Sequence, residues 1–168
     1  MAVVNTKSTA VTNADASSQT LNKKLISNGR VRESIGKVAV ANGDSIGSTL
    51  RFCRLHSSWR VSSVRIYCDA ITSAAMDVGI YQTNENGGAA VDADRFGSAV
   101  SIATAILTGT EVLLESAVLA PGDMEKPLWE ALGLTADPGR FYDLVGTLTA
   151  AATAAGNVVL RVSHVNGD

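Results

Sequence analysis

The stretch RVSSVRIYCDAITSAAMDVGIYQT, residues 60–83, decides the fold class of this protein. Apolar side chains occupy every second position in two parts of it, first at Val64, Ile66 and Cys68 and then at Met76, Val78 and Ile80. A period of two is typical of strands that bury one face and expose the other to water. The stretch therefore predicts two amphipathic strands of a sheet.

The same pattern continues on both sides of this stretch. Short runs of β-branched residues, separated by turn signals such as Asn42-Gly43, occur at 37–44, 48–55, 96–107, 111–116, 140–150 and 157–165. By period, residues 96–107 fit either a strand or a helix, and we interpret them as a strand. The segment 84–94, NENGGAAVDAD, is predicted to be a Gly-rich loop. The segment 123–134, DMEKPLWEALGL, is predicted to be a helix that Asp123 caps, that holds Pro127 in its first turn and that ends at Gly133. About eight strands and one short helix predict a mainly β, antiparallel sandwich.

The N-terminal part of the chain has a different composition. Residues 1–29 are rich in Ser, Thr, Asn and Ala and lack a sustained period, so they cannot bury enough apolar area to become ordered alone. We divide the chain into an extended N-terminal arm, residues 1–34, and a β-sandwich domain, residues 35–168. The arm contains Leu21, Leu25 and Ile26, whose spacing would allow a helical turn when docked on a surface. Its net charge is +3, against −5 for the remainder.

Length and composition restrict the function classes. A chain of 168 residues with 46% apolar but only 5% aromatic side chains predicts one domain with a thin core of small side chains. A formal net charge of −2 supplies no global field that would gather nucleic acid or an anionic membrane. No apolar segment follows Met1, and no run of about 18 apolar residues occurs. We therefore expect a soluble protein without a secretory signal.

The two cysteines, Cys53 and Cys68, do not suggest a disulfide framework. If residues 50–55 and 60–69 form a hairpin around HSSW, Cys53 lies opposite Ser62 and Cys68 lies opposite Gly47. The thiols would then be far apart along the ladder. We expect two free, buried or half-buried cysteines in a reducing compartment.

One motif raises the question of catalysis. Residues 43–47, GDSIG, match the G-x-S-x-G pattern of serine hydrolases, with Ser45 in the nucleophile position. That elbow requires a helix after the serine, whereas STLRFCRL has the composition of a strand. In addition, the residue three positions before His164 is Arg161, whereas the related esterases commonly have an aspartate at that position. We interpret the motif as a turn and expect no enzymatic activity.

The remaining polar candidates are also interpreted as structural. His56 and His164 are isolated from other metal ligands, and we expect both to be exposed loop or strand-end residues. Residues 92–95, DADR, offer too few oxygens for Ca²⁺ and are interpreted as a loop with local charge balance. A pair of acids for glycoside cleavage, Asp69 and Asp77, stays open, although solvent-facing carboxylates are more common. No cofactor or metal is predicted.

Two tryptophans are the other conspicuous residues. Trp129, in the predicted helix, is expected to cover an open end of the sandwich. Trp59, in HSSWR, is equally compatible with packing and with a role as an exposed interaction anchor.

Three stretches of the chain resemble the small head proteins of tailed bacteriophages, in particular the β-sandwich cement or decoration proteins. They are VAVANGDSIGSTLRFCRL, VSSVRIYCDAITSAAMDVGIYQTNENGGAAVDADRF and EKPLWEALGLTADPGRFYDLVGTLTAAATAAGNVVLRV, which together cover most of residues 38–162. The resemblance implies a jelly-roll-like fold, no enzymatic activity, self-association as a dimer or trimer, and the major capsid protein as partner. It also implies a place on the outer surface of the phage head, after synthesis in the host cytoplasm.

On this basis we expect the partner interface to involve the arm and the tryptophan in HSSWR. The arm has the composition of a segment that becomes ordered on a neighbour and wraps a large surface. The expected interface residues are Leu21, Lys23, Lys24, Leu25, Ile26 and Trp59.

Two alternatives from other classes remain. A carbohydrate-binding or receptor-binding sandwich of a phage tail or tailspike would show exposed aromatic residues gathered on one face, for which Trp59, Tyr81 and Tyr67 are the candidates. A serine esterase acting through Ser45 is the weaker alternative.

Overall fold

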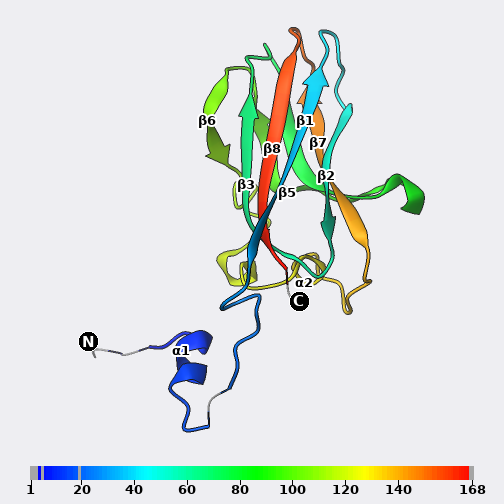
Figure 1. Ribbon diagram of the computed structural model, residues 1–168. Coiled ribbons are helices and arrows are strands. Elements are labelled where there is room, and N and C mark those ends of the chain that lie inside the picture. The colour runs from blue at the N-terminus through cyan, green and yellow to red at the C-terminus, as the bar shows by residue number, and fades with distance from the viewer. Residues whose placement is uncertain (1–3, 5, 19, 167–168) are drawn as a thin grey trace.

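The computed structural model describes residue 4, residues 6–18 and residues 20–166, and it contains two four-stranded sheets. The elements shown in Figure 1 are α1 Thr9–Ala14, β1 Val31–Val40, β2 Thr49–His56, β3 Arg60–Cys68, β4 Ala75–Gln82, η1 Asn84–Asn86, β5 Ala90–Ser101, β6 Ile106–Glu111, η2 Pro121–Asp123, α2 Leu128–Ala131, β7 Phe141–Ala150 and β8 Gly156–Val165. No helix among the described residues is long and apolar enough to span a membrane.

The strand order is that of a jelly roll. Sheet I has the order β1-β8-β3-β6 and sheet II has the order β2-β7-β4-β5, with every neighbouring pair antiparallel. The chain crosses between the sheets at every connection except the one from β4 to β5. The eight strands in two packed antiparallel sheets confirm the predicted sandwich.

The core lies between the two sheets and matches the alternation in residues 60–83. The inward side chains of β3 and β4 are all buried, whereas Arg65 and Tyr67 are half-buried on the outer face. The prediction of a core of small side chains was wrong, because Val, Leu and Ile predominate and the largest fully buried side chains are Tyr142 and Phe96. These two buried aromatic rings make the core bulkier than the low aromatic content suggested.

The predicted hairpin between residues 50–55 and 60–69 was wrong. Strand β2 pairs with β7 in sheet II, and β3 pairs with β8 and β6 in sheet I, so Cys53 lies opposite Leu144 and Cys68 opposite Val158. Both cysteines are free, Cys53 half-buried and Cys68 buried. The turn at HSSW has the local sequence of a hairpin, but it carries the chain from one sheet to the other, so that each strand buries its apolar face.

Three further local predictions need correction. Residues 111–116 do not form a strand: β6 ends at Glu111, whose side chain accepts hydrogen bonds from the Val64 and Leu113 amides and so holds the chain in a turn. The loop predicted at 84–94 is instead η1 followed by the first residues of β5. The helix predicted at 123–134 covers only Leu128–Ala131, because extended Pro127 precedes it.

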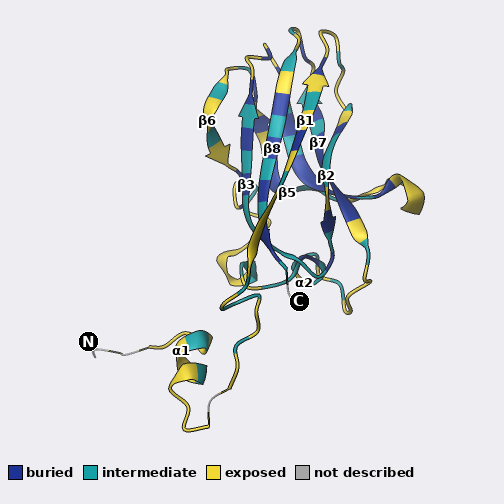
Figure 2. Cartoon of the chain, viewed as in Figure 1, coloured by how far each residue is buried: buried dark blue, intermediate teal, exposed yellow. Residues whose placement is uncertain are grey.

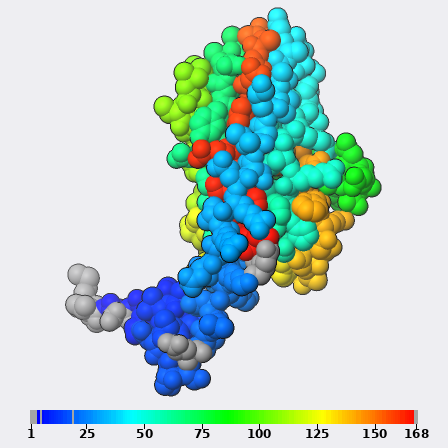
Figure 3. All heavy atoms as spheres, viewed as in Figure 1, coloured from blue at the N-terminus to red at the C-terminus, as the bar shows by residue number. Residues whose placement is uncertain are grey.

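The arm consists of three parts. The described residues up to 22 include α1, which was not predicted, and project away from the sandwich as a separate lobe (Figures 1 and 3). Residues 23–30 form a docked turn, in which the Ile26 and Ser27 amides donate to the Lys23 carbonyl oxygen, as expected for a helical turn. Strand β1 begins at Val31, four residues before the predicted boundary at residue 35.

Candidate functional site

The arm leaves the sandwich at one end, where the β2–β3 turn, α2 and the end of β8 come together (Figure 1). Helix α2 is fastened to that turn, because the Leu128 amide donates to the Trp59 carbonyl at 2.7 Å and the Trp129 amide donates to the Ser57 carbonyl at 3.0 Å. The helix with Trp129 thus covers the end of the sandwich. We call this region the arm end.

The docked turn of the arm is held by an arginine and requires a glycine. The Arg60 guanidinium donates from Nε to the Leu25 carbonyl oxygen at 2.6 Å and from Nη1 to the Met124 carbonyl oxygen at 3.2 Å. A Cβ on Gly29 would overlap the Lys24 carbonyl oxygen and Val165 Cγ1. The turn is therefore an integral part of the arm end rather than a free tail.

The predicted interface residues of the arm divide between its projecting part, which contains Leu21, and the docked turn, which contains Lys23, Lys24, Leu25 and Ile26. Leu21 is 94% exposed, and Lys23 and Lys24 are exposed beside it. Leu25 and Ile26 are half-buried against the chain itself, in the docked turn. They border a groove of about 460 Å³ between the turn and the segment around α2, lined also by Lys23, Gly122, Glu125, Lys126, Pro127, Trp129 and Glu130.

Apolar exposure continues in the projecting part of the arm. Val4 and Val11 are exposed, and α1 contains no buried residue (Figure 2). The Ser8 hydroxyl accepts from the Val11 amide at 3.3 Å and caps the helix, while an Asn13 to Asn22 hydrogen bond of 2.7 Å folds the arm back on itself. The described part of the projecting arm is thus locally ordered, and its helix α1 buries no residue.

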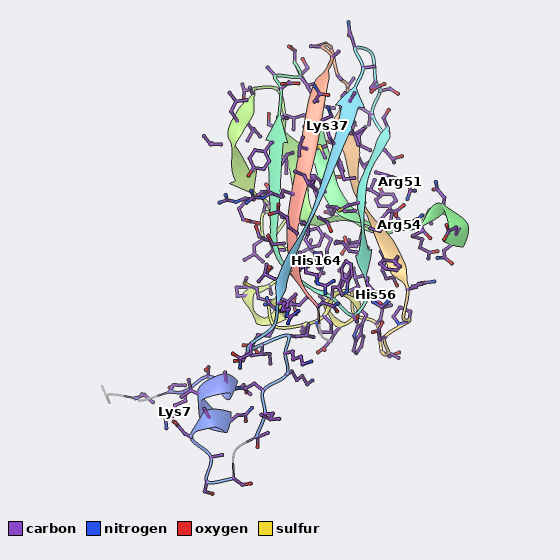
Figure 4. The ribbon with its side chains drawn as sticks, in the orientation of Figure 1. Lys7, Lys37, Arg51, Arg54, His56 and His164 are labelled. Atoms are coloured by element: carbon purple, nitrogen blue, oxygen red, sulfur yellow. The ribbon has the colours of Figure 1, made fainter. Side chains whose placement is uncertain are left out.

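An aromatic cluster occupies the interior of the arm end. Trp59 stacks on His164 with ring centroids 4.1 Å apart and contacts the edge of Phe141 at 5.9 Å, while His56 lies against Phe141 at 4.9 Å. Figure 4 shows both histidines in this region. Trp59 is half-buried and packs within this cluster, and no side chain of the cluster except Phe141 is exposed.

The expectation that His164 is exposed was wrong. Its side chain is 2% exposed, and its Nδ1 has no hydrogen-bond partner among the described residues. Burial, followed by the positive charge of Arg32, lowers the pKa of His164 from its ordinary value of 6.5. His164 is therefore a neutral core residue. His56, at the end of β2, lies at a strand end as expected.

A basic pocket of about 270 Å³ lies next to the cluster. Its lining residues are Lys24, Asn28, Gly29, Arg30, Arg32 and Asn166. The basic excess predicted for the arm is thus gathered where the arm meets the sandwich.

The segment around Ser45 is a turn at the opposite end of the molecule. The Gly43 amide donates to the Ala152 carbonyl and the Gly47 amide to the Leu148 carbonyl, so the segment is held on the β7–β8 connection and on β7. Strand β2 follows it, in place of the helix that an oxyanion site requires. His164 is eight positions beyond Gly156, which pairs with Val40 beside this turn, so about 26 Å of strand separates the two regions.

The carboxylates considered for catalysis bind backbone amides in different sheets. Asp69 Oδ2 accepts from the Asn157 amide at 2.8 Å and its side chain at 2.9 Å, and these bonds lower the pKa of Asp69. Asp77 Oδ1 accepts from the Ala99 amide at 2.7 Å. Each carboxylate therefore links two neighbouring strands through hydrogen bonds.

Residues 92–95 are part of β5 and not a loop, which corrects the interpretation of DADR. Arg95 is buried, 3.6 Å from Asp92 and 4.0 Å from Asp123, rather than balanced by its neighbour Asp94. Within the described residues, no group of three or more His, Cys, Asp or Glu side chains is placed to hold a metal ion.

One polar network was not predicted from the sequence. Buried Asp143 on β7 accepts from Arg51 at 2.7 Å and lies 3.4 Å from Arg54, both on β2. Arg51 also donates to the carbonyl oxygens of Gln82 and Gly88 and so holds the base of the loop around η1, which projects from the sandwich (Figures 1 and 4). The pairing of β2 with β7 creates this network, and no local motif signals it.

Comparisons with known proteins identify the fold. No family model and no curated protein matches the chain. Among solved structures, a chain of the cyanophage Pam1 capsid asymmetric unit is 20% identical, with a TM-score of 0.51, over 82% of this chain and 85% of that chain. A chain from the capsid of Ralstonia phage GP4 is 13% identical, with a TM-score of 0.57, over 83% and 86% of the two chains. At these identities, the likeness establishes a shared fold.

Proposed function

We propose that this chain is a structural protein of a tailed-phage virion, a cement or decoration protein that binds the outside of the head and stabilises it. The observation that carries the proposal is the arm. It is locally ordered, it projects from a jelly roll of the kind present in two phage capsid structures, and it exposes apolar side chains that its own sandwich does not cover. The proposed partners are the major capsid protein and further copies of this chain.

The chemistry of the arm suits attachment to a larger surface. Burying Leu21 or Val11 on a partner would contribute roughly 1.5 to 3 kcal/mol each, whereas ordering a backbone residue costs about 1 to 2 kcal/mol. The Ser8 cap and the docked turn already order part of the arm, which reduces that cost. Many copies on a closed shell add their weak contacts through avidity.

The exposed lysines give the attachment an electrostatic component. Lys23 and Lys24 follow Leu21 in the chain, and Lys24 lines the basic pocket. An acidic capsid surface would attract this region, and added salt would screen that attraction over about 10 Å at 0.1 M ionic strength. Leu25, Ile26 and Trp59 remain proposed interface residues at the margin of the contact, since the chain itself covers part of each.

The proposal is tested with capsids that lack this protein. Purified protein is mixed with such capsids and pelleted with them, and the bound fraction is compared among the wild type, a chain lacking residues 1–22, Leu21→Asp and Leu107→Asp. Leu107 is the matched control, because it is 79% exposed on β6, away from the arm. We expect the truncation and Leu21→Asp to lose binding and Leu107→Asp to retain it. Full binding by the truncated chain would show that the protein attaches to the capsid through its sandwich and not through the arm.

No observation favours the alternative of a tail protein that binds carbohydrate or a receptor. Of the three aromatic residues that it would use, Tyr81 is buried, Trp59 is covered on one face by His164, and Tyr67 is half-buried beneath Arg161. The esterase alternative is addressed by assaying short-chain p-nitrophenyl esters with the wild type and with Ser45→Ala. Turnover that disappears in the variant would support catalysis.

A further inference from the structure

The four edge strands of the two sheets differ in regularity. The pairings of β2 with β7, β6 with β3, and β5 with β4 are each interrupted by register shifts. In contrast, β1 pairs with β8 through ten consecutive residues, from Val31 opposite Val165 to Val40 opposite Gly156, without a shift. A long, regular edge is a template for another strand, and natural proteins usually interrupt or cover such edges.

The outer edge of β1 is not occupied by the chain itself in the described residues. The strand in the other sheet that approaches it most closely is β2, and a Cβ on Gly36 would overlap the Phe52 carbonyl oxygen and lie 2.8 Å from Phe52 Cα. A Cβ bond points out of the plane of a sheet, so β2 passes beneath β1 rather than beside it. Sheet I therefore ends at β1 with one row of backbone groups facing outward.

The side chains on the outer face of β1 have a specific order. Val31 is 66% exposed and Ile35 is 65% exposed, and the charged residues Glu33 and Lys37 lie on either side of Ile35 on the same face. Arg161 of β8 holds Glu33, with Nε 3.2 Å from Oε2. The sequence around Ile35 therefore has opposite charges at equal distances from an exposed apolar residue.

We infer that β1 is the interface with a second copy of this chain, in which two β1 strands pair antiparallel about a two-fold axis at Ile35. In this register Ile35 faces Ile35 of the second copy, Glu33 faces its Lys37 on both sides of the axis, and Val31 faces its Ala39. Cross-strand pairs of opposite charge and apolar pairs stabilise a sheet. The two copies of sheet I join into one continuous sheet, and the isologous contact closes on itself.

Other registers on the same face lack this complementarity. Moving the axis to Ser34 places Glu33 opposite Ile35, and moving it to Gly36 places Lys37 opposite Ile35. Moving it by two positions, to Glu33 or to Lys37, places like charges opposite each other, which destabilises a pair of strands. The charge pattern thus selects the Ile35-centred register. This inference rests on the self-association within the proposed function, but it does not depend on a capsid.

The first test uses purified protein without capsids. Sedimentation velocity over a concentration series measures association of the wild type, Lys37→Glu, and the double variant Glu33→Lys with Lys37→Glu. We expect a dimer for the wild type, association weakened about tenfold or more by Lys37→Glu, because like charges then face each other twice, and recovery in the double variant. Leu107→Lys, on the opposite edge of sheet I, is the control and should dimerise as the wild type does.

A cross-link tests the register directly. Directly opposed residues of antiparallel strands have Cα atoms about 4.5 to 5.5 Å apart, within the range that a disulfide bridges. Ile35→Cys should therefore form a disulfide-linked dimer on mild oxidation, and Leu107→Cys should not. Melting curves of all variants verify folding, and the exposure of residue 35 makes Ile35→Cys a mild change.

The outcomes separate this inference from the proposed function. A wild type that stays monomeric throughout the series, a dimer that Lys37→Glu leaves intact, or an Ile35→Cys chain that does not cross-link overturns the β1 interface. A monomer that still binds capsids would overturn the β1 interface but leave the proposed function in place. A β1-paired dimer that binds no capsid would support the interface and overturn the capsid role.

Discussion

Trp59 and His164 lie face to face, with ring centroids 4.1 Å apart and ring planes 7° apart. The stack joins the β2–β3 turn to the last residues of β8, and Arg32 of β1 is the cross-strand neighbour of His164. The buried His164 ring is thus packed against an indole, with a guanidinium as its charged neighbour.

The stability of the arm end should depend on pH through His164. Burial, and to a smaller extent Arg32, lowers the pKa of this residue in the folded protein below the ordinary 6.5. The unfolded chain therefore binds a proton at His164 more readily than the folded chain does. The contribution of His164 to the free energy of unfolding is fully present above pH 6.5 and decreases as the pH falls below 6.5. Thermal unfolding followed by tryptophan fluorescence between pH 8 and pH 5 should show this decrease.

The matched variants for this prediction are His164→Phe and His56→Phe. The first keeps an aromatic ring against Trp59 but cannot titrate, so its Tm should vary less with pH than that of the wild type. The second changes the other histidine ring of the aromatic cluster and is the control for altered packing there. An equal pH dependence in the wild type and His164→Phe would assign the effect to carboxylates elsewhere.

Gly36→Ala should destabilise the sandwich by about 1 to 3 kcal/mol, the usual cost of overpacking. The added Cβ would overlap the backbone of Phe52 in the opposite sheet, which cannot move aside as a flexible side chain would. Urea unfolding measures the loss. Gly122→Ala is the control, because no atom lies within 4 Å of its added Cβ, and it should change stability by less than about 0.5 kcal/mol.

Cys53 should be unreactive toward thiol reagents in the native protein. Burial, followed by the negative charge of Asp143, raises the pKa of Cys53 to about 11, so the reactive thiolate is scarce at pH 8. In a Cys68→Ser background, the reaction of Cys53 with a disulfide reagent should be faster in Asp143→Asn, because one cause of the raised pKa is removed.

Asp143→Asn should also lower the free energy of unfolding by about 1.5 to 3 kcal/mol, since Arg51 and Arg54 lose their carboxylate partner. Equal thiol reactivity with and without the substitution would show that burial alone controls Cys53. Both cysteines should react fully once the chain is unfolded.

Two truncations should separate the projecting arm from the docked turn. Removing residues 1–22 should leave the Tm unchanged, because α1 buries nothing on the sandwich. Removing residues 1–29 also removes the Leu25 carbonyl oxygen that accepts from Arg60 and should cost about 1 to 3 kcal/mol. Differential scanning calorimetry measures the Tm of the two truncated chains. Equal Tm values would show that the docked turn adds no stability.

The alternating residues of 60–83 were sufficient to predict the strands that became β3 and β4. A period of two is a local property, because each side chain need only point to the buried or the wet face, whichever strand is its neighbour. Local sequence also predicted two turns: the one at the Asn42-Gly43 dipeptide, where Gly43 has a φ of 95°, and the one that contains Ser45, which a strand-like sequence follows. The composition of residues 1–29 indicated an arm but not its helix α1.

Strand pairing and the burial of single polar residues were decided only by the tertiary structure. The HSSW turn was expected to close a hairpin, but β2 and β3 lie in different sheets, because each strand buries its apolar face against strands that are distant in the sequence. His164 was expected to be exposed, and it is buried because the turn brings Trp59 onto its ring. Such contacts arise between segments about a hundred residues apart, where local periodicity carries no information.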